Sequence, residues 1–312
     1  MSDWEARYRK GMAMLKDPKS IEEWRSAIET IDSAALGGFG PALERRSLFE
    51  CMGVGRRPDW GRALDSLGAA AEEGCRRAAQ QLVLLAEDRF EEDPGSYEWT
   101  ALRSQITIEN RLRPRESHTL SPNPLIRTIE GLASPAECRW LIEAARPRLE
   151  RAIVYSNTTG EPRIDPGRTN AFAQFGLADL DLIVEMIRAR ISATIGAPLP
   201  CLEVSQVLRY QIGEEFAPHC DFLDPKAHAP ELARRGQRAA TLLLYLNQDF
   251  EGGETSFEEL KIKHRGQTGD ALLFSNLDPS GNPEPRSKHW GRAPTKGEKW
   301  VFSQWVRDRL PA

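Results

Sequence analysis

The chain has 312 residues, of which 40% are hydrophobic and 28% are charged. This composition is typical of a folded globular protein and argues against a disordered or fibrous chain. A formal net charge of −4 gives no overall basic field, so neither nucleic acid nor an anionic membrane surface is expected as a partner. The start of the chain lacks signal-peptide features, and no apolar run reaches the ~18 residues that would span a bilayer, so we expect a cytoplasmic protein.

The length and the cysteines narrow the organisation further. Because one domain usually holds roughly 100 to 200 residues, two domains are expected. The five cysteines are odd in number, widely spaced and free of any C-x-x-C pair. They are therefore interpreted as mostly reduced, buried thiols rather than a disulfide framework.

Residues 1–92 have apolar residues at helical spacing and contain an internal repeat. A period in the thirties, with alanine on the packed faces and glycine at the turn, predicts pairs of antiparallel helices. The residues that recur at an offset of 36 are Trp24 and Trp60, Ala27 and Ala63, Ala34 and Ala70, Ala35 and Ala71, Gly38 and Gly74, Ala42 and Ala78, and Leu48 and Leu84.

The segment 70–78, with the sequence AAEEGCRRA, resembles the SEL-type branch of tetratricopeptide-like repeats. The resemblance implies a surface that binds a protein or peptide, which could include the substrate. A helical brace for the next domain or a dimer contact fits equally well, because about two repeats are visible and three or more usually make a free-standing array. The oligomeric state stays open.

The rest of the chain predicts an α+β arrangement, in which the helical repeats precede a β-rich domain. Residues 93–120 are polar, contain prolines and have linker composition. In the domain of residues 121–312, Ser134 and Glu137 predict a capped helix over 134–149, and a second helix is expected over 177–195. The strand-like runs 202–212, 239–247, 271–275 and 299–307 then predict a mostly antiparallel jelly roll, or double-stranded β-helix.

Three side chains in this domain are candidate metal ligands. His219 and Asp221 lie two residues apart in a strand-like run and can share one face, and His289 follows 68 residues later, just before the last strand. Two histidines and one carboxylate form the facial triad of non-haem Fe(II) oxygenases, which leaves positions open for other ligands. An H-x-D pair alone is a weak signal, since a surface histidine beside a turn aspartate is the simpler explanation. Iron affinity should fall below pH ~6.5, where free imidazole protonates.

The other motifs occur in an order that resembles the prolyl 4-hydroxylase branch of the Fe(II)- and 2-oxoglutarate-dependent dioxygenases. They are R-Y-x-x-G at 209–213, H-x-D at 219–221, Y-L-N at 245–247, G-G-E-T-x-F at 252–257, H-x-G-x-x-P at 289–294 and G-x-K-W at 297–300. The resemblance implies that His219, Asp221 and His289 are the catalytic iron ligands. It also implies that Lys299 binds the distal carboxylate of 2-oxoglutarate, with Tyr210 and Thr255 as hydrogen-bond partners and Trp305 as a wall of the pocket.

Some of these roles have simpler alternatives. A dianion that enters an apolar barrel needs a paired distal charge, which suits Lys299, although a lysine in a last strand is otherwise a solvated edge charge. Tyr210 and Trp305 could be plain core residues. One departure is Phe216, where the family often has tyrosine, and it concerns the substrate contacts rather than the metal.

Residues 155–170 resemble the family's mobile loop over the substrate groove, and their glycine, proline and asparagine content suits such a lid. Arg168 is the candidate substrate-binding residue in this loop. An ordinary exposed loop is the alternative.

The implied reaction is hydroxylation of a C–H bond, foremost that of a prolyl residue in a peptide or protein. Fe(II), 2-oxoglutarate and O2 are the implied cofactor and co-substrates, with succinate and CO2 released and ascorbate as a candidate reductant. A free amino acid or a small peptide natural product is the alternative substrate. A non-catalytic repeat adaptor or sensor with an oxygenase-like scaffold is the alternative from another class, and the complete triad with Lys299 argues against it.

Overall fold

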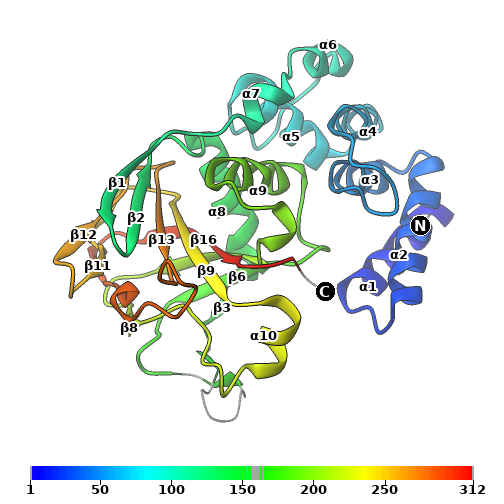
Figure 1. Ribbon diagram of the computed structural model, residues 1–312. Helices are drawn as coiled ribbons and strands as arrows, with labels where there is room; N and C mark the ends of the chain where they lie inside the picture. Colours follow the sequence, from blue (N-terminus) through cyan, green and yellow to red (C-terminus); the bar gives the residue numbers. More distant parts are fainter. Residues whose placement is uncertain (1, 153, 156–161, 164, 311–312) are drawn as a thin grey trace. The chain divides into compact units, whose positions relative to one another are not determined.

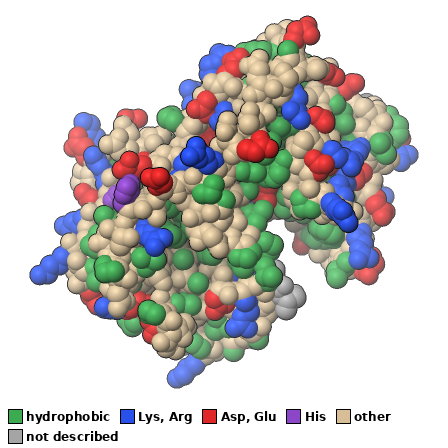
Figure 2. Space-filling view, turned by 45° about the horizontal axis from the view of Figure 1, so that its top comes forward, with side chains coloured by type: hydrophobic (Ala, Val, Ile, Leu, Met, Phe, Trp, Pro, Cys, Tyr) green, Lys and Arg blue, Asp and Glu red, His purple; other side chains and the backbone are tan. Residues whose placement is uncertain are grey.

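The computed structural model describes residues 2–152, 154–155, 162–163 and 165–310. The chain forms two compact units. The first holds Met1–Arg113 together with Phe175–Arg190, and the second holds Pro114–Gln174 and Ile191–Ala312. Within the described residues, no helix is both long and apolar enough to cross a bilayer. Acidic and basic side chains are interspersed on the face that Figure 2 shows.

The first unit is helical (Figure 1). The 36-residue repeat corresponds to two helical hairpins, so the predicted helix pairs are confirmed. Segments between 93 and 113, expected as linker, form two further short helices, and Arg111 there donates to the carbonyl of Leu85 at 2.6 Å. The helices are α1 (Asp3–Lys16), α2 (Ile21–Leu36), α3 (Gly40–Met52), α4 (Trp60–Glu72), α5 (Arg76–Glu87), α6 (Trp99–Ser104), α7 (Ile108–Leu112) and the first part of α9 (Leu182–Ile195).

The turns inside the two hairpins have the same geometry. Gly38 and Gly74 adopt left-handed φ angles of 78° and 76°, a conformation that glycine reaches without steric cost. In each turn the residue after the glycine donates its N–H to the carbonyl five residues earlier. These bonds run from Phe39 to Ala34 at 3.2 Å and from Cys75 to Ala70 at 2.9 Å.

The second unit contains two main antiparallel sheets. The large sheet has the order β1 (Ser117–Pro122), β2 (Leu125–Ile129), β13 (Ala271–Ser275), β9 (Arg238–Tyr245), β16 (Lys299–Arg307), β7 (Ser205–Tyr210), β6 (Ala171–Phe175), β3 (Glu150–Arg151). The small sheet has the order β12 (Ile262–His264), β11 (Thr255–Phe257), β14 (His289–Gly291), β8 (Phe216–His219). Two short pairs, β10 (Glu251–Gly252) with β15 (Pro294–Lys296) and β4 (Val154–Tyr155) with β5 (Pro162–Arg163), complete the set.

The strands from β7 onward alternate between the two sheets. Strands β7, β9, β13 and β16 lie in the large sheet, while β8, β11 and β14, which fall between them in the sequence, lie in the small one. Figure 1 shows β8, β11 and β12 gathered on one side of β13 and β9. This alternation is the winding of a double-stranded β-helix, so the predicted fold class is confirmed.

The element boundaries follow local signals. Helix α8 (Pro135–Ala145) begins with the predicted capping box of Ser134 and Glu137 and continues into the 3-10 turn η1 (Arg146–Arg148). Helix α9 begins at Leu182 rather than at 177, because residues 176–180 form a turn and Asp181 accepts the N–H of Val184 at 2.9 Å. The remaining short helices are η2 (Leu199–Cys201), α10 (Ala229–Arg235) and η3 (Pro285–Ser287). All five cysteines are free thiols, as expected.

Candidate metal centre

The structure brings the three candidate metal ligands together in the second unit. His219 ends β8 and lies opposite His289, the first residue of the neighbouring strand β14, while Asp221 lies two residues after the end of β8. The Nε2 atoms of His219 and His289 are 3.6 Å and 3.7 Å from the Asp221 carboxylate oxygens. One ligand atom from each residue lies within 4.8 Å of the others. Among the described residues, this is the only such group of three.

Backbone carbonyls orient both imidazoles. Nδ1 of His219 lies 2.8 Å from the carbonyl oxygen of Ala217, and Nδ1 of His289 lies 3.1 Å from that of Ser287. Because a carbonyl oxygen can only accept, each Nδ1 carries the hydrogen, and each Nε2 keeps its lone pair on the side of Asp221. This is the tautomer that a metal ion requires.

Burial keeps the two rings neutral. It lowers the pKa of His219 to about 3, with a further contribution from His289, and it also lowers the pKa of His289. Burial alone would raise the pKa of Asp221, but in the acid range, where His289 and His219 carry protons, their charge and the hydroxyl of Thr241 outweigh it and hold that pKa at about 2. Protonation of His219 therefore begins well below the pH of ~6.5 that the sequence suggested from free imidazole, and protonation of His289 also shifts to lower pH.

The donor set fits a divalent transition metal. Two neutral imidazole nitrogens and one carboxylate on one side of a pocket are the ligands that Fe(II) prefers, and they leave positions open for co-substrates. These three residues could hold such an ion.

One pocket contains every residue that the sequence singled out for the site. Its lining includes the three candidate ligands together with Lys299, Tyr210, Thr255, Trp305 and Arg168. From the large sheet, every second residue of β16 from Lys299 to Trp305 lines the pocket. Tyr210 of β7, which is paired with Lys299 in the sheet, lines it as well.

Lys299 is a buried cation at one end of β16. Its side chain is 2% exposed, and Nζ lies 5.1 Å from the ring centre of Tyr210 and 5.7 Å from that of Tyr245. Burial lowers its pKa to about 7, with Glu254 acting in the opposite direction. In the part of the chain that the structure describes, no carboxylate lies at ion-pair distance from it. A buried ammonium group without an anion is a receptor for a carboxylate ligand.

Thr255 and Tyr210 line the same pocket as this lysine. Thr255 is in strand β11 and accepts a hydrogen bond from the hydroxyl of Tyr245 at 3.0 Å. Burial raises the pKa of Tyr210 to about 12, so its phenol stays protonated and can donate. Tyr245 was missed from the sequence, although its alternation with Leu243 along β9 placed it on the same face.

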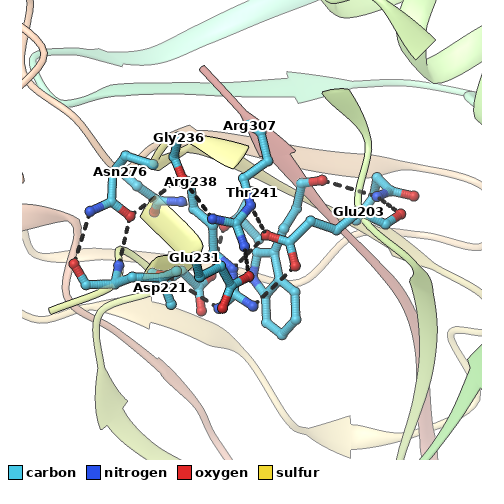
Figure 3. A network of polar contacts seen from close by, with 12 residues as sticks. Glu203, Asp221, Glu231, Gly236, Arg238, Thr241, Asn276 and Arg307 are labelled. Atoms are coloured by element: carbon cyan, nitrogen blue, oxygen red, sulfur yellow. Dashed lines mark hydrogen bonds and ion pairs between the residues drawn. The ribbon is translucent and has the colours of Figure 1, made fainter. Parts of the chain in front are cut away.

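Trp305 lines the pocket, and Arg238, which lies over its ring, belongs to an ion-pair network (Figure 3). The guanidinium carbon of Arg238 lies 3.5 Å from the centre of its ring. Arg238 forms a two-pronged ion pair with Glu203 at 2.8 Å and 3.1 Å, and Glu203 also pairs with Arg307. Arg307 in turn pairs with Glu231 of α10. The indole is therefore a rigid wall.

A short hydrogen-bond relay reaches the Asp221 carboxylate (Figure 3). The Thr241 hydroxyl donates to Oδ2 of Asp221 at 2.7 Å, and the Asn276 amide donates to the Thr241 oxygen at 2.9 Å. Thr241 is 1% exposed and Asn276 is fully buried. Because an amide nitrogen only donates, the single hydrogen of Thr241 must point to Asp221. Neither residue has a role that could be predicted from the sequence.

Arg168 lies beside the small sheet. Its backbone forms an isolated antiparallel β-bridge with Phe216, and its guanidinium carbon lies 4.5 Å from the centre of the Phe216 ring. That ring stacks on the imidazole of His219, with 3.4 Å between the ring centres. Arg168 is 8% exposed, so it is a buried pocket residue rather than an exposed one. Residues 156–161 and 164 of the predicted lid lie outside the described residues.

Comparison with known proteins agrees with this geometry. Residues 205–307 match the family model of the 2OG-Fe(II) oxygenase superfamily. Probable prolyl 4-hydroxylase 4 of Arabidopsis thaliana is 32% identical over 216 residues, which cover 62% of this chain and 71% of the relative. Prolyl 4-hydroxylase 1 of the same plant is 34% identical over 204 residues, covering 61% and 71%.

Solved structures are also similar. A collagen prolyl hydroxylase of Paramecium bursaria Chlorella virus 1, solved with 2OG, is 26% identical, covers 58% of this chain and 94% of its own, and has a TM-score of 0.45. From the identity to the plant enzymes and the family match over the strands that carry the pocket, the chain belongs to the prolyl 4-hydroxylase family of the 2OG-Fe(II) oxygenases.

Proposed function

We propose that this protein hydroxylates prolyl residues in a peptide or protein, consuming 2-oxoglutarate and O2 and releasing succinate and CO2. The observation that carries the proposal is the pocket itself. It joins the His219–Asp221–His289 cluster, in which both imidazoles are neutral, to a buried lysine, in a member of a family whose plant relatives are named prolyl 4-hydroxylases.

In this proposal His219, Asp221 and His289 hold Fe(II) through two Nε2 atoms and one carboxylate oxygen. When bound, the iron supplies the activation of dioxygen that couples decarboxylation of 2-oxoglutarate to hydroxylation. Lys299 pairs with the distal carboxylate of the co-substrate, while Tyr210 and Thr255 offer hydroxyl groups to it. Burial of these groups excludes water from the pocket.

The substrate end of the pocket is assigned to Trp305 and Arg168. The flat indole, fixed by Arg238, suits packing against a pyrrolidine ring, and the guanidinium of Arg168 can donate to peptide carbonyls. Phe216, in place of the family's frequent tyrosine, gives this region an apolar surface between Arg168 and His219.

The test measures succinate and hydroxyproline together. Purified protein is incubated with Fe(II), 2-oxoglutarate and a proline-rich peptide, with and without ascorbate, and the peptide is analysed for a gain of one oxygen. His219→Ala should abolish both products, whereas His118→Ala, at an exposed histidine of β1, should leave them unchanged. Succinate without any oxidised proline would contradict the assigned substrate.

Two alternatives have distinct results in the same assay. Oxidation of free proline in preference to the peptide would favour the free amino acid alternative. Absence of 2-oxoglutarate turnover in wild-type protein loaded with iron would favour the adaptor or sensor. The complete pocket supports catalysis over this second alternative.

A further inference from the structure

The first unit includes a segment from much later in the sequence. Phe175–Arg190 belongs to the region expected to form the oxygenase domain, yet it forms one compact unit with the repeat helices. We propose that helices α3 and α5 form a binding surface whose ligand is this chain's own turn 176–182, so that the repeats and the start of α9 fold as one obligate unit. The repeats would then be an internal brace, and this surface would not be free for a partner protein.

Arg45 of α3 makes the main contacts with the turn. Its side chain is buried and donates to three backbone carbonyls that precede α9. The bonds reach Leu177 at 3.2 Å, Ala178 at 3.2 Å and Leu180 at 2.6 Å. A guanidinium group that satisfies three carbonyls of one turn recognises the backbone conformation of that turn.

Helix α5 binds the start of α9. The fully buried Gln81 accepts the N–H of Leu182, the first residue of α9, at 3.0 Å, and it donates to Glu44 at 2.8 Å. Arg77 pairs with Asp181 at 2.5 Å, while the other oxygen of Asp181 accepts the N–H of Val184. Gln81 thus accepts one of the N–H groups at the start of α9 that have no partner within the helix. Arg77 holds Asp181, which accepts another.

The apolar contacts agree with this assignment. Leu177 packs against the hydrophobic core that α1, α2 and α3 share. Two hairpins are too few for a stable free-standing array, since each repeat buries its faces only against its neighbours. In this chain Leu177 of the turn adds a further apolar contact to that core.

Hydrogen exchange on the intact protein tests the proposal. Arg45→Met keeps the length and apolar character of the side chain but removes its donors, and Arg57→Met changes an exposed arginine as the matched control. We expect roughly tenfold faster exchange of the amides of residues 180–190 in Arg45→Met, because buried charge-assisted hydrogen bonds are lost. Arg57→Met should exchange like the wild type there.

Asp181→Asn is the milder variant, and it decides the question if Arg45→Met does not fold. It removes the charge that Arg77 binds but keeps an oxygen for the N–H of Val184. Faster exchange in both α9 and α5 would support one cooperative unit. Wild-type exchange over 176–190 in every folded variant would overturn the proposal. This result does not depend on the enzymatic activity, so it can be judged separately from the proposed function.

Discussion

The charge of Lys299 depends on pH near neutrality. With its pKa lowered to about 7 by burial, the ammonium form predominates below pH 7 and the neutral amine above it. A carboxylate ligand needs the ammonium form. We therefore expect the affinity for 2-oxoglutarate to fall as the pH rises above 7, by up to about tenfold per pH unit.

Calorimetry gives a direct readout of this coupling. With Mn(II) in place of iron, 2-oxoglutarate binding at pH 8 should take up protons, so the apparent enthalpy should differ between buffers of different ionisation enthalpy. In Lys299→Arg the charge is permanent, and the pH dependence should disappear even if the affinity changes. An affinity that stays constant from pH 7 to 9 in the wild type would show that Lys299 is already charged in the free pocket.

Thr241 is expected to position Asp221, the candidate metal ligand. Thr241→Val keeps the shape of the side chain but removes the hydroxyl, so Asp221 loses a donor and Asn276 loses its acceptor. Loss of such a partner typically weakens metal binding ~10- to 100-fold. Titration of the protein with Co(II), followed by its absorption spectrum, should show weaker binding and altered bands.

Thr241→Ser is the conservative control for this relay, because it keeps the hydroxyl. It should restore both the Co(II) affinity and the spectrum. If Thr241→Val binds Co(II) as tightly as the wild type and with the same spectrum, Thr241 has only a packing role.

At the scale of elements, two glycines of the repeats should respond in opposite ways to alanine. An added Cβ meets no atom within 4 Å at either Gly74 or Gly68. Gly74 has a φ of 76°, so Gly74→Ala should lower the free energy of unfolding by about 1 kcal/mol. Gly68 lies inside α4, where alanine should raise it by about 0.5 to 1 kcal/mol. Urea unfolding measures both values, and equal effects would contradict the conformational explanation.

The elements that were predicted correctly are those marked by residues close together in the sequence. Ser134 and Glu137 are three residues apart, and they fix the start of α8 by bonds to each other's backbone. The strands β13 and β16 match the predicted runs 271–275 and 299–307, because alternating or continuous apolar residues mark buried strands. The grouping of His219, Asp221 and His289 could be predicted because they occur within an ordered series of family motifs, whereas the H-x-D pair alone is a weak signal.

The features that the sequence missed depend on contacts between distant positions. Asn276 and Thr241, which are hydrogen-bonded, lie 35 residues apart in the sequence, and the hydrogen-bonded Arg45 and Leu180 lie 135 apart. An arginine in a helix has the pattern of a solvated charge until its partner's position is known. The late start of α9 has a similar origin, since an apolar pattern alone does not separate the turn at 176–180 from the helix that follows.

At the scale of the whole molecule, the site should make stability depend on pH. An unfolded histidine protonates near 6.5, whereas His219 in the folded protein protonates at about 3. Between these values the unfolded chain binds a proton that the folded chain does not, so stability falls as the pH falls. Asp221, with a folded pKa of about 2 against 3.8 when unfolded, acts in the same direction at lower pH.

Metal binding should add to this stability and share its pH dependence. A divalent ion that binds only the folded state stabilises it by ~2.7 kcal/mol at one hundred times the dissociation constant. Urea unfolding at pH 7.5, 6 and 5, with Ni(II) or with a chelator, should show a metal-dependent gain in the free energy of unfolding of the wild type.

His219→Gln should lose that gain and, with the chelator, should show a weaker fall in stability toward low pH. The exposed His118→Ala should behave like the wild type in both respects, because its imidazole takes no part in the buried cluster. If His219→Gln kept the full wild-type pH dependence without metal, the buried imidazole could not be its source.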